Sequence, residues 1–114
     1  MNLKQALQEN NSIRLGLTAK DWKEAVKLSV VPLIESGAVK PEYYDAIIES
    51  TEQYGPYYIL MPGMAMPHAR PEAGVQRDAF SLITLTEPIQ FSDGKDVSVL
   101  LALAATSSKI HTSV

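Results

Sequence analysis

The sequence has no cysteine and only two histidines, His68 and His111, among its 114 residues. Without cysteine the protein can form no disulfide and no thiolate metal site, and thiol catalysis is excluded. A metal site needs three or four ligands, whereas Glu72 is the only carboxylate close to His68 in the sequence. We therefore expect no bound metal ion and no cofactor.

Long hydrophobic runs and an excess of basic residues are also missing. The longest apolar run, residues 99–105, is far shorter than the ~20 residues of a membrane-spanning helix. Residues 1–5 lack the apolar core of a signal peptide. Lys and Arg number 10 against 13 Asp and Glu, so the net charge is −3, with no basic cluster for nucleic acid. These absences predict a soluble, cytoplasmic protein with no nucleic-acid partner.

Motifs of nucleotide binding and serine hydrolysis are absent too. The sequence contains no P-loop, no Gly-x-Gly-x-x-Gly and no Gly-x-Ser-x-Gly. What is present is an ordinary globular composition, with 46% hydrophobic and 20% charged residues. A chain of this length suffices for one domain with its own core, and we expect a single domain over residues 1–114.

Helical patterns dominate the first half of the chain. Apolar spacing predicts a short helix over residues 3–9 and, after an alternating strand at residues 12–17, a long helix. Thr18 begins a capping box that opens this long helix, and Gly37 ends it. Pro32 lies inside the pattern, where a proline kinks or divides a helix.

A second long helix follows at Pro41, a residue suited to the first turn because its missing N–H costs nothing there. Tyr54-Gly55-Pro56 stops this helix. Its expected inner face consists of Tyr44, Ile47, Ile48 and Thr51.

Extended patterns dominate the second half. Residues 57–61 and 64–67 are two short extended segments around a Pro62-Gly63 turn, and residues 79–86 form a β-rich run broken by Glu87-Pro88. Residues 97–105 fit a strand buried on both faces. Helices followed by strands predict an α/β or α+β layered domain on a mixed sheet.

The sequence ends soon after its most apolar strand, although a doubly buried strand needs a covering layer on each face. We therefore expect either a chain shortened at its C-terminus or coverage by another chain. An uncovered apolar strand also makes a homo-oligomer plausible.

His68 lies in a proline-rich stretch, between Pro62 and Pro71 and directly after Pro67. Prolines fix the backbone, so this stretch presents its imidazole rigidly. A neutral imidazole can attack phosphorus and form a phosphohistidine, and Arg70 would share its face of an extended segment. Spacing alone still favours a structural histidine at a strand end and a solvated arginine.

Two other groups of side chains remain ambiguous in the sequence. His111 lies among polar residues and is either a surface histidine or a partner of His68. The tyrosines resemble a stacking platform, but their spacing favours core or rim packing. These are Tyr43, Tyr44, Tyr54, Tyr57 and Tyr58.

The segment from Pro62 to Arg70 resembles the Gly-x-Ala-x-Pro-His-x-Arg/Thr signature of mannitol/fructose-type EIIA domains, the EIIA type-2 family of the bacterial sugar phosphotransferase system. The resemblance continues through residues 87–91, through Asp96 and Val97, and into a histidine after a polar loop. It covers essentially the whole chain. Residues 57–63 and 66–75 look most like the ascorbate branch.

The resemblance implies a cytoplasmic phosphocarrier. His68 matches the family histidine that takes a phosphoryl group from phospho-HPr and passes it to the cysteine of a cognate EIIB. EIIB then phosphorylates a carbohydrate, here L-ascorbate, as the membrane protein EIIC imports it. His111 matches the family's second histidine, which supports the first. The implied fold is a mixed sheet flanked by helices on both sides.

The chain departs from the family pattern in two places. Many relatives carry an arginine near the end of the second long helix, but residues 49–51 contain none. Arg70, backbone N–H groups or Ser50 would then hold the phosphoryl group. The family domain also continues beyond Val114 into further helices, which agrees with a shortened C-terminus.

Two other functions remain open at this point. Nitrogen-type relatives with the same histidine signature regulate a partner protein through their phosphorylation state. A plain interaction module with an inactive site is the second alternative.

Overall fold

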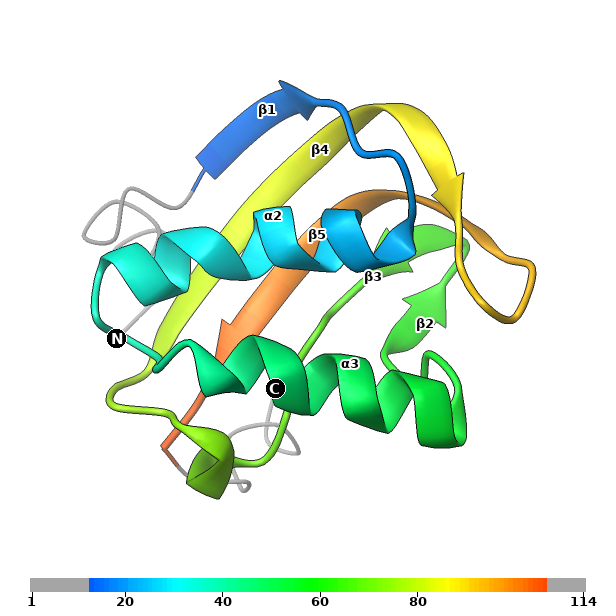
Figure 1. Ribbon diagram of the computed structural model, residues 1–114. Helices are drawn as coiled ribbons and strands as arrows, with labels where there is room; N and C mark the ends of the chain where they lie inside the picture. Colours follow the sequence, from blue (N-terminus) through cyan, green and yellow to red (C-terminus); the bar gives the residue numbers. More distant parts are fainter. Residues whose placement is uncertain (1–12, 107–114) are drawn as a thin grey trace.

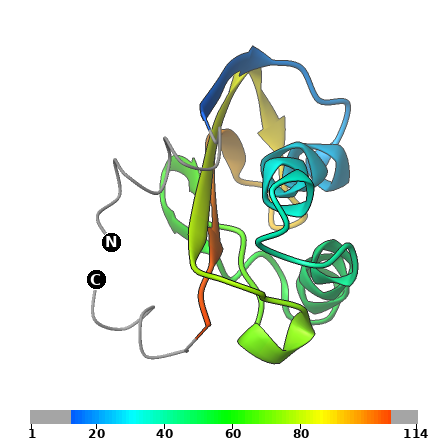
Figure 2. The same ribbon diagram turned by 90° about the vertical axis from the view of Figure 1, so that its left-hand side faces the viewer.

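The computed structural model describes residues 13–106, which form a mixed sheet of five strands with two helices packed on one of its faces (Figures 1 and 2). In chain order the elements are β1 (Ile13–Leu17), α2 (Trp22–Glu35), α3 (Glu42–Tyr54), β2 (Ile59–Met61), β3 (Gly63–Ala65), η1 (Pro71–Ala73), β4 (Ala79–Gln90) and β5 (Asp96–Ala104). This confirms the predicted α/β class and the mixed sheet. The helix expected over residues 3–9 lies outside the described residues.

The sheet has the strand order β1-β4-β5-β3-β2. Neighbours β1 and β4 are parallel, as are β3 and β5, whereas β4–β5 and β2–β3 are antiparallel. β5 therefore lies in the middle, and the chain crosses over from β3 to β4. Figure 2 shows α2 and α3 together on one side of this sheet.

Helix α2 begins one residue after Asp21, whose carboxylate accepts a hydrogen bond from the Glu24 N–H at 2.8 Å. The Glu24 carboxylate accepts in turn from the Lys20 N–H at 3.1 Å. This reciprocal pair satisfies N–H groups that a helix start leaves without partners. The prediction of Thr18 as the cap is wrong, because the capping pair lies three residues later.

We expect Asp21→Ala to lower the free energy of unfolding by about 1 kcal/mol, the usual cost of losing an N-cap side chain. Urea denaturation of the two proteins measures this difference. Lys20→Ala is the matched control, because Glu24 contacts the backbone of residue 20 and not its side chain. Equal stability of Asp21→Ala and Lys20→Ala would show that the cap contributes nothing.

Helix α2 continues as one helix through Pro32 to Glu35, so the expectation of a divided helix is wrong. The Pro32 ring is fully buried, and this apolar burial offsets the missing hydrogen bond. Gly37 then ends the helix with a φ of 79°, a left-handed conformation that glycine adopts without strain.

Helix α3 buries Tyr43, Ile47 and Thr51 against the sheet. The expected inner face was one residue off at its start, because Tyr43 is fully buried and Tyr44 only half-buried. Spaced four apart, these residues form one stripe of the helix, as amphipathic packing requires. Tyr44 and Ile48, one position further along, are half-buried and pack against the edge of this core.

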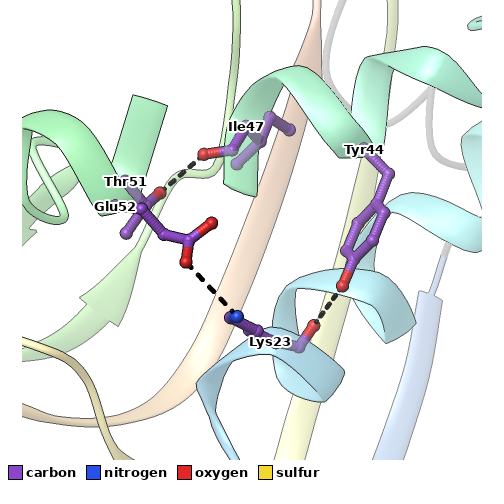
Figure 3. A network of polar contacts seen from close by, with 5 residues as sticks. All are labelled: Lys23, Tyr44, Ile47, Thr51 and Glu52. Atoms are coloured by element: carbon purple, nitrogen blue, oxygen red, sulfur yellow. Dashed lines mark hydrogen bonds and ion pairs between the residues drawn. The ribbon is translucent and has the colours of Figure 1, made fainter. Parts of the chain in front are cut away.

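Two polar contacts join α2 to α3 at the surface (Figure 3). The Tyr44 hydroxyl donates to the Lys23 carbonyl oxygen at 3.2 Å, and the Lys23 ammonium lies 3.4 Å from the Glu52 carboxylate. An exposed ion pair adds little stability by itself. The buried stripe, and not these exposed contacts, is therefore what holds α3 on the sheet.

Strand β4 runs unbroken from Ala79 to Gln90, so the predicted break at Glu87-Pro88 is wrong. Its pairing with β5 shifts register between Thr84 and Ile89. A proline fits in a strand at such an irregularity. The sequence signal was real, but it marked a bulge and not an end.

The apolar sequence of β5 predicted a strand buried on both faces. β5 lies in the middle of the sheet, but its two faces are not equally buried. Leu100 and Ala102 are fully buried in the core with the helices. The alternate side chains of Val99 and Leu101 point to the opposite face and are half-buried.

Candidate functional site

His68 lies in the segment that follows β3, where the parallel strands β3 and β5 end beside α3. Figure 1 shows this segment leaving β3, passing behind α3 and reaching η1. The carboxyl ends of parallel strands commonly form binding sites, because loops leave the sheet there. The topology thus places the proline-rich segment at an edge suited to a functional site.

The backbone around His68 is held on three sides. The Met66 N–H donates to the Tyr58 carbonyl oxygen at 2.9 Å, and the Leu103 N–H donates to the Pro67 carbonyl oxygen at 3.0 Å. The Ala69 N–H donates to the Tyr43 hydroxyl at 3.0 Å. Bonds from β5, α3 and the chain before β2 therefore fix a segment that prolines had already restricted.

The Tyr43 hydroxyl connects α3, the His68 segment and β5. It accepts from the Ala69 N–H and donates to the Leu103 carbonyl oxygen at 2.7 Å. Burial raises the pKa of Tyr43 to about 12, which its hydrogen bond with the Ala69 backbone only partly offsets. The hydroxyl therefore stays protonated at neutral pH and can donate and accept at once.

Tyr58 forms a second connection from α3. Its hydroxyl lies 2.9 Å from the Thr51 hydroxyl, which donates to the Ile47 carbonyl oxygen at 2.7 Å, so Tyr58 is the donor to Thr51. Burial raises the pKa of Tyr58 to about 12 as well, and this rise is opposed because the Thr51 hydroxyl can turn to donate to the ionised form. The side chain of Tyr58 is thus anchored to α3, and its carbonyl oxygen holds Met66.

The His68 imidazole has a defined tautomer in this setting. Its Nδ1 lies 2.7 Å from the Met66 carbonyl oxygen, which can only accept, so Nδ1 carries the proton. A neutral imidazole protonated on Nδ1 has its lone pair on Nε2. The half-buried ring is therefore arranged to react through Nε2.

Tyr57 also belongs to the site, although its spacing in the sequence favoured core or rim packing. Its hydroxyl donates to the His68 carbonyl oxygen at 2.5 Å. Its ring meets the imidazole edge-on, with ring centres 5.4 Å apart and planes at 88°. Burial raises the pKa of Tyr57, and a side-chain hydrogen bond with Ser50 opposes the rise. The only sequence signal was its place at the start of the extended segment before the signature.

A cavity of about 710 Å³ lies beside His68, between α3 and η1. Its wall on α3 consists of Ala46, Ser50 and Tyr54, which are spaced four apart and so share a helix face. The cavity is further lined by Tyr57, His68, Ala69, Arg70, Pro71, Glu72 and Ala73. The structure thus brings an imidazole, a guanidinium and a hydroxyl together around one space.

Arg70 is exposed, and it lines this cavity together with Ser50 of α3. His111 lies outside the described residues, so its proximity to His68 stays a prediction. His68 itself follows Pro67 in a segment without regular secondary structure, and its chemical role stays a prediction.

A metal-binding cluster and a membrane-spanning helix are both absent from the described residues. Between residues 13 and 106, no group of three His, Asp or Glu side chains could hold a metal ion. Neither helix of this part of the chain is long and apolar enough to cross a membrane.

The fold is that of mannitol-type EIIA domains. The solution structure of the mannitol-specific cryptic phosphotransferase enzyme IIA CmtB from Escherichia coli matches it with a TM-score of 0.87 at 37% identity, over 99% of this chain and 77% of that one. A more distant neighbour, at 24% identity and a TM-score of 0.76, is the mannitol IIA protein of Escherichia coli solved in complex with phosphorylated IIB; it covers 89% and 72% of the two chains.

The sequence agrees with this fold assignment. The chain belongs to the phosphoenolpyruvate-dependent sugar phosphotransferase system EIIA 2 family, whose model matches residues 6–114. It is 47% identical over 116 residues to the ascorbate-specific EIIA component of Salmonella typhimurium, covering all of this chain and 75% of that protein. The crystal structure of the IIA protein PtxA from Streptococcus mutans matches at 88% identity and a TM-score of 0.98, over 100% and 73% of the two chains.

Proposed function

We propose that this protein is a phosphocarrier that accepts a phosphoryl group from phospho-HPr on Nε2 of His68 and passes it to the cysteine of a cognate EIIB. The observation that carries the proposal is the hydrogen bond from Nδ1 to the Met66 carbonyl oxygen, in a family of phosphotransferase components. That bond leaves the lone pair on Nε2, the nitrogen that must attack.

In this transfer, His68 is the only nucleophile that the protein has to supply. The Nε2 lone pair forms a bond to phosphorus as the bond between phosphorus and the donor atom of phospho-HPr breaks, and that electron pair leaves with the donor. The proton on Nδ1 stays hydrogen-bonded to Met66 while positive charge develops on the ring. In the second step a thiolate sulfur of EIIB attacks the phosphorus, and the electron pair of the phosphorus–nitrogen bond returns to Nε2 as the leaving group.

Arg70 and Ser50 are proposed to hold the phosphoryl oxygens. Phosphoryl transfer depends mainly on positioning and on cationic or N–H groups around the equatorial oxygens. Arg70 and Ser50 line the cavity at His68 from different elements, η1's start and α3. They take the place of the helix arginine that residues 49–51 lack. Glu72 lines the same cavity and limits the positive charge there.

The partner and the transported carbohydrate are proposed from relatives. The mannitol IIA protein of Escherichia coli forms a complex with phosphorylated IIB, and we assign the same kind of partner to this chain. The ascorbate-specific relatives favour L-ascorbate, imported by a membrane EIIC, as the carbohydrate. Such a carrier works in the cytoplasm, where phospho-HPr is available.

The test is a reconstituted phosphoryl transfer. Incubation with phosphoenolpyruvate, enzyme I and HPr is expected to add one acid-labile phosphoryl group, which peptide mapping assigns to His68. Addition of an ascorbate-type EIIB then removes the label, and a mannitol-type EIIB serves as the specificity control. Absence of an acid-labile phosphoryl group would contradict the proposal. A stable phosphoryl group that no EIIB removes would favour a regulatory role instead.

A further inference from the structure

The peptide group that joins His68 to Ala69 is held at both of its polar ends by tyrosine hydroxyls. The Tyr57 hydroxyl donates to its carbonyl oxygen at 2.5 Å, and the Tyr43 hydroxyl accepts from its N–H at 3.0 Å. The C=O and N–H of a trans peptide point in opposite directions. The two hydroxyls therefore bind opposite edges of one rigid peptide plane.

This double contact fixes the backbone on the C-terminal side of His68. Rotation of the peptide plane would break both hydrogen bonds at once, because the six atoms move together. On the N-terminal side, the Pro67 carbonyl oxygen is already bonded to the Leu103 N–H. The Cα of His68 is thus held between two fixed peptide planes.

The Tyr57 ring also restrains the imidazole itself. A histidine side chain rotates easily about its second torsion, since that torsion is broad. The hydrogen bond from Nδ1 to Met66 fixes one edge of the ring, and the Tyr57 ring packs edge-on against it at 5.4 Å. Tyr57 is itself packed against the fully buried Tyr58, with ring centres 5.0 Å apart. The imidazole is therefore connected to the hydrophobic core through Tyr57 and Tyr58.

We propose that Tyr57 and Tyr43 act as positioning residues for phosphoryl transfer, by clamping the His68–Ala69 peptide so that Nε2 meets the phosphorus in line. This inference rests on the proposed role of His68. Neither tyrosine has to touch the phosphoryl group for the clamp to work. Small errors in the placement of a reacting atom cost much of the rate, whereas they change affinity little.

Tyr57→Phe is the decisive variant, because Tyr57 is 42% exposed and the phenylalanine keeps the ring. We expect the rate constant of transfer from phospho-HPr at saturation to fall about 10-fold, with KM changed by less than about two-fold. The final level of phosphorylation stays at that of wild type. In NMR spectra of the His68 ring, the proton on Nδ1 should exchange with solvent faster than in wild type.

Tyr44→Phe is the matched control. It also removes one tyrosine hydroxyl of the α3 region that donates to a backbone carbonyl, but its acceptor is Lys23 on α2. We expect wild-type transfer from this variant. Tyr43→Phe is a secondary test, because loss of a fully buried hydroxyl also affects folding.

The outcomes separate the clamp from the proposed function. Transfer by Tyr57→Phe at the rate of Tyr44→Phe would overturn the clamp and leave His68 as the acceptor. A change in KM alone would overturn it too, since that marks a contact with the donor protein. A wild-type protein that gains no phosphoryl group would overturn both the clamp and the function on which it rests.

Discussion

His68→Asn is expected to abolish phosphoryl incorporation while leaving the fold intact. Asparagine carries an amide N–H₂ close to the position of Nδ1, so it can still donate to the Met66 carbonyl oxygen that now accepts from His68. It has no nucleophilic nitrogen. We expect the transfer rate to fall by at least about a thousandfold, because a covalent carrier has no route without its nucleophile.

The stability of His68→Asn should stay within about 1 kcal/mol of wild type, since the half-buried ring is replaced and its main hydrogen bond is kept. Urea denaturation and quantification of acid-labile phosphate measure the two effects on one sample. His68→Gln is the matched control for geometry: it too lacks the nucleophile, but its amide lies nearer the position of Nε2. Both variants should be inactive.

Residual acid-labile phosphate on His68→Asn would move the acceptor to another residue, and His111 is the other histidine. His111→Asn then decides between the two. If His68 is the carrier and His111 only assists, His111→Asn slows transfer more than it changes stability. Unchanged transfer in that variant would show that the second imidazole takes no part.

The location of His68 was predictable because its determinants are local. Pro67 and Pro71 restrict the backbone whatever the rest of the chain does, and the structure has His68 in a segment without regular secondary structure between them. The tautomer depends on Met66, which is two residues away. Local sequence therefore specifies both the presentation of the imidazole and a partner for its Nδ1. The proline pattern indicates only the first of these.

The clamp was not predictable from the sequence, because its partners meet only in the folded sheet. Tyr43 lies 60 residues before Leu103, whose carbonyl oxygen accepts from the same hydroxyl that holds Ala69. A tyrosine on a helix gives no sign of such a role, and apolar spacing even favoured Tyr44 for the inner face. The contact of Tyr43 with Leu103 and Ala69 depends on the order of the strands, which is a property of the whole sheet.

Burial of the strands shows the same limit. Alternation in β1 correctly indicated a strand, but Leu15 is 67% exposed, since β1 is an edge strand whose pattern does not say which face is covered. Pro88 was read as the end of a strand because a proline lacks an N–H. It lies instead where β4 and β5 shift register, and this site depends on the partner strand.

Alkaline pH is expected to destabilise the protein steeply, through the two buried tyrosines that hold the His68 segment. Burial raises the pKa of Tyr43 and of Tyr58 to about 12, against about 10 in an unfolded chain. Below pH 10 both tyrosines are protonated in the folded and in the unfolded state. They therefore add no pH dependence to the free energy of unfolding in this range. Between pH 10 and 12 the unfolded chain binds fewer protons, and the free energy of unfolding falls as pH rises.

The size of this effect is large compared with the stability of a small domain. Each tyrosine contributes at most about 1.4 kcal/mol per pH unit, and less near pH 10 and pH 12, so the pair removes about 4 kcal/mol between these two values. A domain is typically stable by about 5–15 kcal/mol. Both side chains are fully buried, so solvent does not screen the effect in the folded state. Urea denaturation at half-unit pH intervals measures the slope.

Tyr58→Phe and Thr51→Val separate ionisation from the loss of a hydrogen bond. Both variants remove the bond between the two hydroxyls, and both should be less stable than wild type at pH 9. Only Tyr58→Phe also removes a titrating group, so its stability should fall less steeply above pH 10. Thr51→Val keeps the buried tyrosine and loses the contact that lowers its pKa, so its slope should match or exceed that of wild type. Parallel curves for the two variants would show that a buried tyrosine at this position does not govern alkaline unfolding.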